Sequence, residues 1–417
     1  MDIASDPDSH QRDRTLIFVA AFVRAIAIAM TGVLLGVYLH RLQFSATAIG
    51  ATITAGLAGG ALAALVATFT ADRFGRRRFL RWIALLSAAG GFVVAYASAE
   101  RAVIAAAFLG MVNGMGRDRG AAMIIEQAIL PSTVPDERRT HTFAVYNVLL
   151  SAGAAIGGLI AGTPALLQRT GWVASELGAL RAGMGLYAAL MAAVAILYLF
   201  LSRVVESEHP QAGFKVSPQS RSVLARLSGL FLLDSLGGGF LTQALVSFFF
   251  VERFGVSAAE VGMLFFGAAI ANALSQFAAA WLARRIGLVN TMVFTHIPGN
   301  LLMVAVAFAP TFPIAAVLFL ARESLVQMDV PTRQSYVMAV VAPAERTLAS
   351  GVTGLVRMGG WALAPTLAGA VMEGLSLTTP FIIGPGLKVL YDVLLFRAFS
   401  GLRPPEEHRA AAGASRA

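Results

Sequence analysis

Apolar stretches of about 20 residues, the length needed to cross roughly 30 Å of hydrocarbon, recur twelve times along the chain. Hydrophobic residues make up 57% of the sequence and charged residues only 13%, against about 25% charged in a soluble globular chain. The pattern therefore predicts an all-α integral membrane protein with twelve transmembrane helices. The expected spans are residues 15–39, 47–69, 79–98, 102–130, 140–167, 179–201, 224–250, 258–281, 291–309, 313–338, 347–371 and 379–399.

The net charge is +9, and the basic residues behind it are distributed along the chain as in a membrane protein. If both termini are cytoplasmic, twenty basic residues fall in the inner segments and five in the outer ones, and such a bias sets orientation and requires an even number of helices. A nucleic-acid surface would instead gather its basic residues on one soluble face. We expect a multi-pass protein of the cell (inner) membrane that binds no nucleic acid. The five outer basic residues are Arg41, Arg101, Arg169, Arg181 and Arg253.

Several kinds of chemistry are excluded by what the sequence lacks. It has no cysteine, so disulfides, thiolate zinc sites and cysteine nucleophiles are impossible. It has no Gly-x-x-x-x-Gly-Lys-Ser/Thr phosphate loop, so the energy for any transport should come from an ion gradient or the substrate gradient. The first apolar stretch is too long for a signal-peptide core and should stay in the mature protein. We expect no cofactor and no metal.

The two halves of the chain are related by a repeat. A shift of 212 residues aligns Arg14 with Arg226, and it also aligns Arg41 with Arg253. Repeats of six helices have parallel topology, and transporters built this way bind substrate near the midplane between the repeats; simple structural duplication is the alternative. The expected parts are a cytoplasmic tail at 1–14, six-helix bundles at 15–201 and 223–399, a cytoplasmic linker at 202–222 and a cytoplasmic tail at 400–417.

The loop between the second and third spans combines an acid, a turn glycine and several arginines. Such a loop can latch helix ends together, because Asp is favoured near a helix N-terminus and Arg near a C-terminus; the alternative is a basic loop that only follows charge topology. Its residues Ala71, Asp72, Arg73, Gly75, Arg76 and Arg77 resemble the loop signature of the major facilitator superfamily, although Thr68 and Thr70 replace the usual Gly and Leu. The resemblance covers essentially the whole chain and implies a gating role for Asp72, Arg73, Gly75, Arg76 and Arg77.

The fifth span contains small residues four apart, which let helix backbones approach closely. The pattern is similar to the antiporter motif of the same superfamily, with Gly158 and Ala161 at the Pro and first Gly of its Pro-x-x-Gly-Gly segment. The resemblance favours export over import. A related pattern in the eleventh span favours the alternative of close packing alone. The expected packing residues are Gly153, Gly157, Gly158 and Gly162.

Thirteen residues of the types Asp, Glu, Lys and Arg lie more than three positions from either end of an expected span. Because a charge at membrane depth is costly, each is by default a functional candidate. Arg24 and Asp234 sit at similar depth and could pair across the halves, whereas Lys388 and Asp392, four residues apart, should neutralise each other. The expected substrate or proton path comprises Arg24, Arg117, Asp118, Asp234, Arg322 and Asp329, and two gate residues are Glu126 and Arg333.

Spacing suggests further arrangements. Arg119 and Glu126 are seven residues apart and would share a face of a continuous fourth helix. The adjacent Arg322 and Glu323 should point in different directions, and His296 should be a packed residue rather than a ligand.

Three functions are compatible with these patterns. The first is proton-coupled antiport that exports a small organic compound by alternating access. The second is uptake or exchange of a small organic anion held by Arg24, Arg117 and Arg322. The third is a sensor that keeps a transporter fold without transport. An enzyme is not expected; the partners should be a small-molecule substrate, protons and the lipid bilayer, and the protein should be a monomer.

Overall fold

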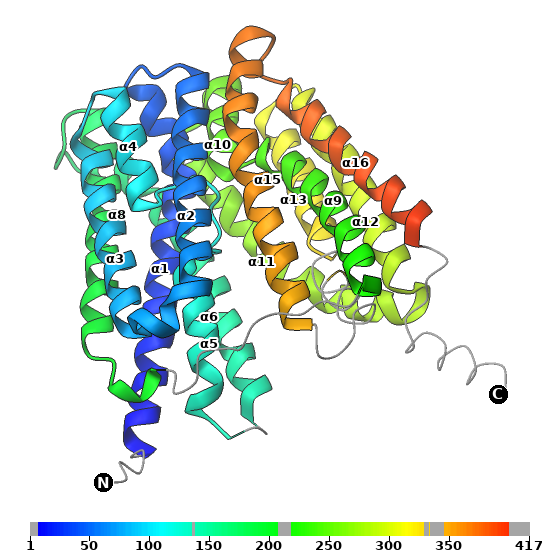
Figure 1. The fold of residues 1–417 in the computed structure, drawn as a ribbon. Helices are drawn as coiled ribbons and strands as arrows, with labels where there is room; N and C mark the ends of the chain where they lie inside the picture. Colours follow the sequence, from blue (N-terminus) through cyan, green and yellow to red (C-terminus); the bar gives the residue numbers. More distant parts are fainter. Residues whose placement is uncertain (1–6, 136–137, 207–217, 329–332, 334–345, 400–417) are drawn as a thin grey trace. The chain divides into compact units, whose positions relative to one another are not determined.

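The computed structural model describes residues 7–135, 138–206, 218–328, 333 and 346–399 (Figure 1). Over these residues the chain is all-helical and contains no strand. Nine helical stretches in this part of the chain are long and apolar enough to cross a membrane. The fold is thus that of an integral membrane protein, as expected from the apolar stretches.

Every expected span contains helix. The helices of the first half are α1 (Pro7–Arg41), α2 (Ala46–Phe74), α3 (Arg76–Tyr96), α4 (Glu100–Gly110), α5 (Ala121–Ile129), η1 (Leu130–Thr133), α6 (Arg139–Ile160), α7 (Thr163–Arg169), α8 (Glu176–Leu199) and η3 (Arg203–Val205). Those of the second half are α9 (Pro218–Gly239), α10 (Gln243–Phe254), α11 (Ala258–Ile286), α12 (Leu288–Ala307), α13 (Phe312–Val326), α15 (Arg346–Gly374) and α16 (Pro380–Phe399).

The prediction of one continuous fourth helix over residues 102–130 was wrong. Helix α4 stops at Gly110, α5 starts at Ala121, and the ten residues between them are not helical. Gly116 has a positive φ of 73°, a conformation that glycine adopts without strain. A Cβ there would also collide with the Gln243 side chain. Gly116 therefore favours the unwound backbone at this point of the span.

Three other expected spans are also interrupted. The span 140–167 is divided between α6 and α7, and the span 224–250 between α9 and α10 after the run Gly237, Gly238 and Gly239. Helix α13 ends at Val326, short of the expected boundary at 338. Glycine lowers helix stability by about 1 kcal/mol relative to alanine, which explains why the seventh span breaks after three in a row.

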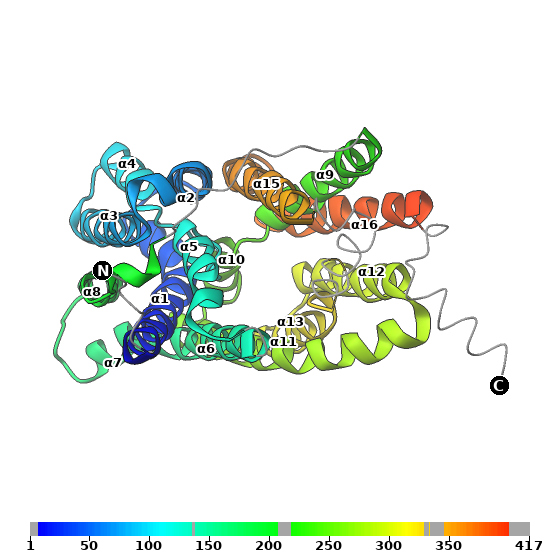
Figure 2. The same cartoon turned by 60° about the horizontal axis from the view of Figure 1, so that its bottom comes forward.

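The chain divides into two compact units. Unit 1 consists of the described residues of Met1–Ala212, Thr242–Phe266 and Pro365–Leu377, and unit 2 of those of Gly213–Leu241, Gly267–Ala364 and Thr378–Ala417. In unit 1, α1 packs against α6, α8 and α10, while α3 packs against α4 and α8; Figure 2 shows α3 beside α8 and α1 beside α6. Helix α1 is thus the centre of unit 1.

Unit 1 also includes contacts between the two sequence halves. Thr366, in the part of α15 that belongs to unit 1, donates its hydroxyl to Thr54 on α2 at 2.9 Å. A Cβ on Gly50 or Gly369 would meet the backbone of the other helix. Small residues therefore let α2 and α15 approach closely here.

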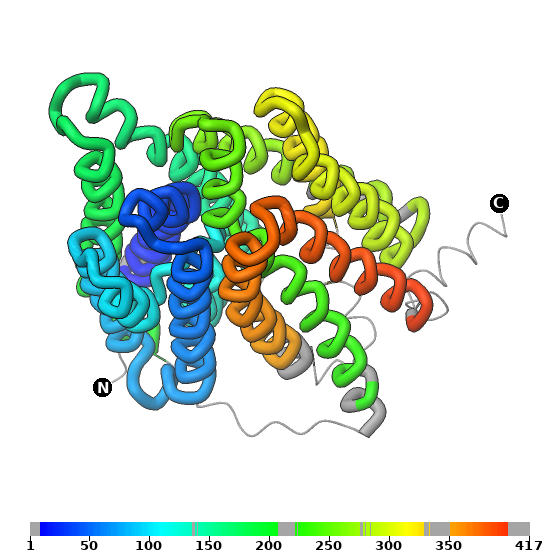
Figure 3. The backbone as a smooth tube through the Cα atoms, turned by 90° about the horizontal axis from the view of Figure 1, so that it is seen from above, coloured from blue at the N-terminus to red at the C-terminus, as the bar shows by residue number. Residues whose placement is uncertain are grey.

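Unit 2 is organised around α12 and α16. Helix α16 packs against both α12 and α9, and α13 packs against α12; Figure 3 shows α16, in red, running alongside α9, in green. Phe231, Tyr391 and Leu227 are fully or almost fully buried in one apolar cluster of this unit. This cluster supports the parts of α9 and α16 that carry buried charges.

Candidate functional site

A buried ion cluster on α1 lies at the centre of unit 1. Arg24 donates from Nε to Asp118 Oδ2 at 2.6 Å, and from Nη1 and Nη2 to the two oxygens of Glu126 at 2.9 and 2.5 Å. The three side chains are 4%, 3% and 0% exposed. The paired bonds to Glu126 have the fork geometry in which arginine binds carboxylates best. We call Arg24, Asp118, Glu126, Tyr146 and Tyr198 the Arg24 cluster.

Two tyrosines complete this cluster. Tyr146 on α6 donates its hydroxyl to Glu126 Oε2 at 2.7 Å, and Tyr198 on α8 donates to Glu126 Oε1 at 2.6 Å. The Tyr198 oxygen also accepts from Arg24 Nη1 at 2.6 Å. Glu126 therefore receives four hydrogen bonds, and the cluster ties together α1, α5, α6 and α8.

The unwound segment 111–120 positions Asp118. Asn113 holds the segment by accepting from the backbone N–H of Met115 at 3.0 Å, and the carbonyl of Gly114 accepts from the N–H of Ala244 at 2.9 Å. Non-helical backbone at membrane depth is tolerated where it is buried in protein or lines a wet cavity. The Asp118 carboxylate accepts one more bond, from the N–H of Gly120 at 3.3 Å.

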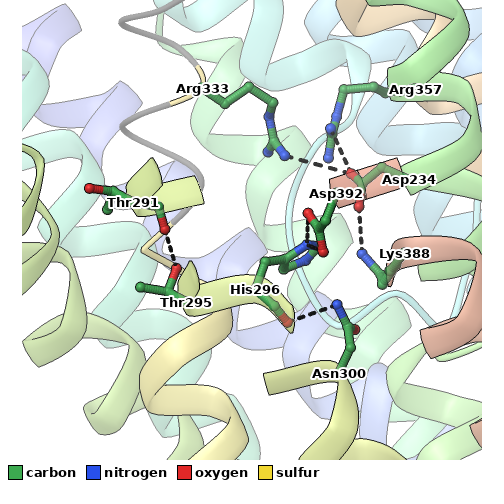
Figure 4. Close-up of polar contacts among 9 residues, drawn as sticks. All are labelled: Asp234, Thr291, Thr295, His296, Asn300, Arg333, Arg357, Lys388 and Asp392. Carbon is green, nitrogen blue, oxygen red and sulfur yellow. Dashed lines mark hydrogen bonds and ion pairs between the residues drawn. The ribbon is translucent and has the colours of Figure 1, made fainter. Parts of the chain in front are cut away.

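A second ion cluster lies in unit 2, around Asp234 on α9. Lys388 Nζ on α16 donates to Asp234 Oδ1 at 2.7 Å, and Arg357 Nη1 on α15 donates to Oδ2 at 2.9 Å. Arg333 Nη1 lies 3.6 Å from Oδ2. Figure 4 shows three cationic side chains converging on one carboxylate. We call Asp234, Arg333, Arg357 and Lys388 the Asp234 cluster.

The expected pair of Lys388 with Asp392 is not formed. The Asp392 carboxylate instead bonds His296 Nδ1, at 2.9 and 3.0 Å to its two oxygens, while Lys388 turns to Asp234 (Figure 4). His296 and Asp392 are 1% and 0% exposed. Helix α16 packs between α9 and α12, so each charge on it finds a partner on a different neighbour. His296 is buried, as expected, and it also anchors a carboxylate.

Arg24 and Asp234 find their partners separately. Arg24 is bonded to partners within unit 1, and Asp234 is bonded to partners within unit 2. Glu126, the expected gate residue on α5, lies fully buried and is paired with Arg24. The face that Glu126 was expected to share with Arg119 required a continuous helix, which the break at 111–120 removes.

Of the remaining path candidates, Arg117 belongs to unit 1 and Arg322 to unit 2. Arg322 and its neighbour Glu323 on α13 bond each other rather than pointing apart, and Glu323 Oε2 also accepts from Asn272 Nδ2 at 2.8 Å. Arg117 is half-buried on the unwound segment. Asp329 lies outside the described residues.

The loop with the superfamily-like signature is bonded to a residue that sequence reasoning missed. Glu206, just after the sixth span, accepts from the backbone N–H of Arg76 at 2.6 Å and from Arg77 Nε at 3.1 Å. Arg76 Nε also donates to Asp72 at 2.8 Å. Gly75 has a φ of 100°, and Arg73 is exposed. The feature that could have indicated Glu206 is its position as an acidic residue shortly after the sixth span.

The four glycines of the fifth span lie at two helix contacts. A Cβ on Gly153 or Gly157 would meet the backbone of α1 at Phe22 or Ile26. A Cβ on Gly158 or Gly162 would meet α11 at Gly262 or Ala259, respectively. The glycines thus bring α6 close to the helix that carries Arg24.

Sequence reasoning also missed the two tyrosines and gave Arg357 no role. A tyrosine in an apolar span needs a partner for its hydroxyl, which could have indicated Tyr146 and Tyr198. Arg357 could have been given a role because it lies inside an expected span, where a charged side chain is costly unless it has a partner.

The sequence profile of the Major Facilitator Superfamily matches residues 17–321 and, in a second match, residues 227–416. The chain belongs to the Major Facilitator Superfamily. It is 24% identical over 424 residues to "Uncharacterized membrane protein YJR124C" of Saccharomyces cerevisiae, covering 94% of this chain and 95% of the yeast protein. This membership confirms the family that the loop between α2 and α3 resembled.

Solved structures of this superfamily type have the same fold. The crystal structure of the nucleoside transporter NupG has a TM-score of 0.72 at 17% identity, with 93% of this chain and 98% of that chain covered. The human organic anion transporter MFSD10 has a TM-score of 0.63 at 19% identity, with 93% and 99% covered. An inward-facing bacterial homologue of the lysosomal transporter Spinster has a TM-score of 0.66 at 16% identity, covering 94% and 96%.

Membership and fold together define the protein's general activity. It is a multi-pass membrane transporter of a small substrate rather than an enzyme. Within so broad a superfamily the fold alone does not identify a substrate, so the two ion clusters are the features from which a mechanism must be argued.

Proposed function

We propose that the protein is a proton-coupled antiporter that exports a small organic compound by alternating access. The observation that carries the proposal is that two buried carboxylates, Asp118 and Glu126, share one arginine. Two like charges in a dry site are costly together, and a proton on one of them removes the repulsion.

Asp118 is the better proton carrier of the two. Glu126 receives four hydrogen bonds from Arg24, Tyr146 and Tyr198, all of which stabilise its charge. Asp118 receives one bond from Arg24 and one from the N–H of Gly120. A proton on Asp118 would weaken its bond to Arg24 while leaving Arg24 paired with Glu126.

Protonation of Asp118 can be converted into movement through the unwound segment. The bond to Arg24 attaches residues 111–120 to α1, and the bond between Gly114 and Ala244 attaches the same segment to α10. Arg117 and Arg119 flank Asp118 and have interactions of their own. Loading and unloading of this carboxylate would thus release and restore one of the attachments of the segment.

The export direction is supported by the glycines of the fifth span. They resemble an antiporter motif and place α6 against α1, the helix that carries Arg24. We further propose two six-helix bundles at 15–201 and 223–399, cytoplasmic termini, a location in the cell (inner) membrane and a monomer. These follow from the repeat and from the distribution of the basic residues.

Uptake or exchange of a small organic anion is the second candidate. It is favoured by the three cations of the Asp234 cluster rather than by the arginines first considered, since Arg24 is held by two carboxylates. The solved structure of MFSD10 is described as that of an organic anion transporter, which agrees with this alternative at the level of fold only.

The test uses proteoliposomes that contain a pH-sensitive dye, challenged with a panel of organic anions, cations and neutral compounds. We expect a transported compound to move protons in the opposite direction. Asp118→Asn should abolish the proton movement yet keep exchange of labelled for unlabelled substrate. Glu176→Gln, an exposed acid paired with Arg41, is the matched control. Unchanged proton-linked flux in Asp118→Asn would contradict the proposal.

A further inference from the structure

The Asp234 cluster is built like an anion-binding site that already contains an anion. Three cations from separate positions in the chain point at one carboxylate, two of them within 2.9 Å of its oxygens (Figure 4). The carboxylate is 2% exposed, while the side chains of Arg333, Lys388 and Arg357 are 10%, 10% and 14% exposed. The cationic side of the cluster is therefore its more accessible side.

The charged neighbours do not cancel this arrangement. Asp392 and His296 lie beside the cluster (Figure 4), and Asp392 bonds His296 rather than Lys388. Among the described residues, the cluster and this neighbouring carboxylate together contain three lysine or arginine cations and two carboxylates.

Aromatic rings lie against the arginines. The Arg357 guanidinium lies 4.8 Å from the Trp361 ring and 5.8 Å from the Phe231 ring, and Arg333 lies 5.7 Å from the same Phe231 ring. A ring within about 6 Å of a guanidinium attracts it. Phe231 is buried in the apolar cluster of this unit, whereas Trp361 is 9% exposed and is the apolar neighbour that a ligand beside the charge can reach. The fitting ligand is an organic anion with an apolar or aromatic body.

We propose that the Asp234 cluster is the substrate site of the transporter and that it binds a carboxylate or phosphate group of an organic anion, which takes the place of the Asp234 carboxylate on Arg357 and Lys388. This rests on the proposed function in that the protein is a transporter, but it holds for either direction. Asp234 is then an internal competitor that occupies the cations while the site is empty. It also keeps the cations paired once the substrate leaves.

Because Asp234 competes with the substrate for the same cations, its replacement should change anion affinity in the opposite direction from the replacement of a binding residue. A residue that only binds substrate weakens binding when it is removed. Asp234→Asn, which keeps the size of the side chain and removes its charge, should instead tighten anion binding, because the incoming anion no longer displaces a carboxylate. Arg357→Gln should weaken binding at least tenfold, since it removes a charge-assisted bond.

The experiment measures binding of benzoate and phenylphosphate to the purified full-length protein, by thermal shift and by calorimetry, with neutral benzamide as the isosteric probe. We expect the two anions to bind and benzamide not to bind. Arg226→Gln, an exposed arginine on the same helix as Asp234, is the matched control and should bind as the unaltered protein does. Lys388→Gln is the second variant, with weaker anion binding expected, should Asp234→Asn fail to fold.

Three results would overturn the inference: equal binding of benzoate and benzamide, no binding of either anion, or unaltered affinity in Arg357→Gln. Tighter binding in Asp234→Asn supports it, and weaker binding there contradicts the competitor role. Equilibrium binding in detergent needs no proton gradient. Anion binding without proton-linked flux would therefore refute only the proton coupling, and proton-linked flux without anion binding would refute only this site.

Discussion

The Arg24 cluster and the Asp234 cluster have opposite charge balances. In unit 1, one arginine is surrounded by two carboxylates and two tyrosines. In unit 2, one carboxylate is surrounded by three cations. Each cluster joins helices through a central charge, but the central charge is positive in one and negative in the other.

The opposite charge balances suggest that the two clusters bind different species. A cluster with surplus carboxylate can take up a proton, whereas a cluster with surplus cation can take up an anion. The clusters also differ in accessibility, because the outer groups of the Arg24 cluster are at most 3% exposed and those of the Asp234 cluster are 10–14% exposed. The repeated halves of the sequence thus carry sites that are not copies of each other.

The largest effect is expected at the centre of the Arg24 cluster. Arg24→Gln leaves two buried carboxylates without their cation, and breaking such a pair costs about 3–5 kcal/mol of unfolding free energy. Denaturant unfolding of the purified protein measures this. The matched control is Arg41→Gln, an exposed arginine at the end of the same helix, where about 0–1 kcal/mol is expected. Equal losses at the two positions would show that the cluster does not stabilise unit 1.

A somewhat smaller loss is expected at the centre of the Asp234 cluster. Asp234→Asn leaves three cations facing one another, but their partial exposure lets water reach them, so we expect a loss of about 2–3 kcal/mol. Added benzoate should restore stability in this variant more than it raises that of the unaltered protein. Thermal unfolding with and without benzoate gives both quantities. An equal benzoate effect in both proteins would break the contrast between the clusters.

Replacing each tyrosine of the Arg24 cluster should show whether a residue with two bonds in the cluster contributes more stability than a residue with one. Tyr198 both accepts from Arg24 and donates to Glu126, whereas Tyr146 only donates to Glu126. Tyr198→Phe should therefore cost about 2–3 kcal/mol and Tyr146→Phe about 1–2 kcal/mol, the range for hydrogen bonds to charged groups. Denaturant unfolding of the two variants side by side tests the order, and a larger loss in Tyr146→Phe would contradict it.

The smallest effect is expected from removal of one of the three cations. Lys388→Met leaves Asp234 with Arg357 at 2.9 Å and Arg333 at 3.6 Å, so the loss of stability should be about 1 kcal/mol or less, in the range of polar contacts inside membrane proteins. Thermal unfolding checks this value. A loss as large as that of Arg24→Gln would show that Lys388 holds the carboxylate alone and that the cationic surplus is only apparent.

Sequence patterns predicted the helices better than their continuity. Each of the twelve spans expected from length and hydropathy contains helix among the described residues, because the bilayer requires a long apolar stretch for each crossing. They did not reveal the break at 111–120, where glycines that favour close packing also permit a positive φ at Gly116. The same residue type serves both purposes, and only the position of Gln243 beside Gly116 distinguishes them.

The sequence by itself indicated a membrane transporter and showed which residues carry charge at membrane depth. These properties follow from hydropathy, the loop signature and the cost of burying ions, all of which can be evaluated along the chain. The tertiary structure decided which charges meet: Arg24 with Asp118 and Glu126, and Lys388 with Asp234 instead of Asp392. An ion pair depends on atoms within about 4 Å, and only helix packing determines which residues come that close.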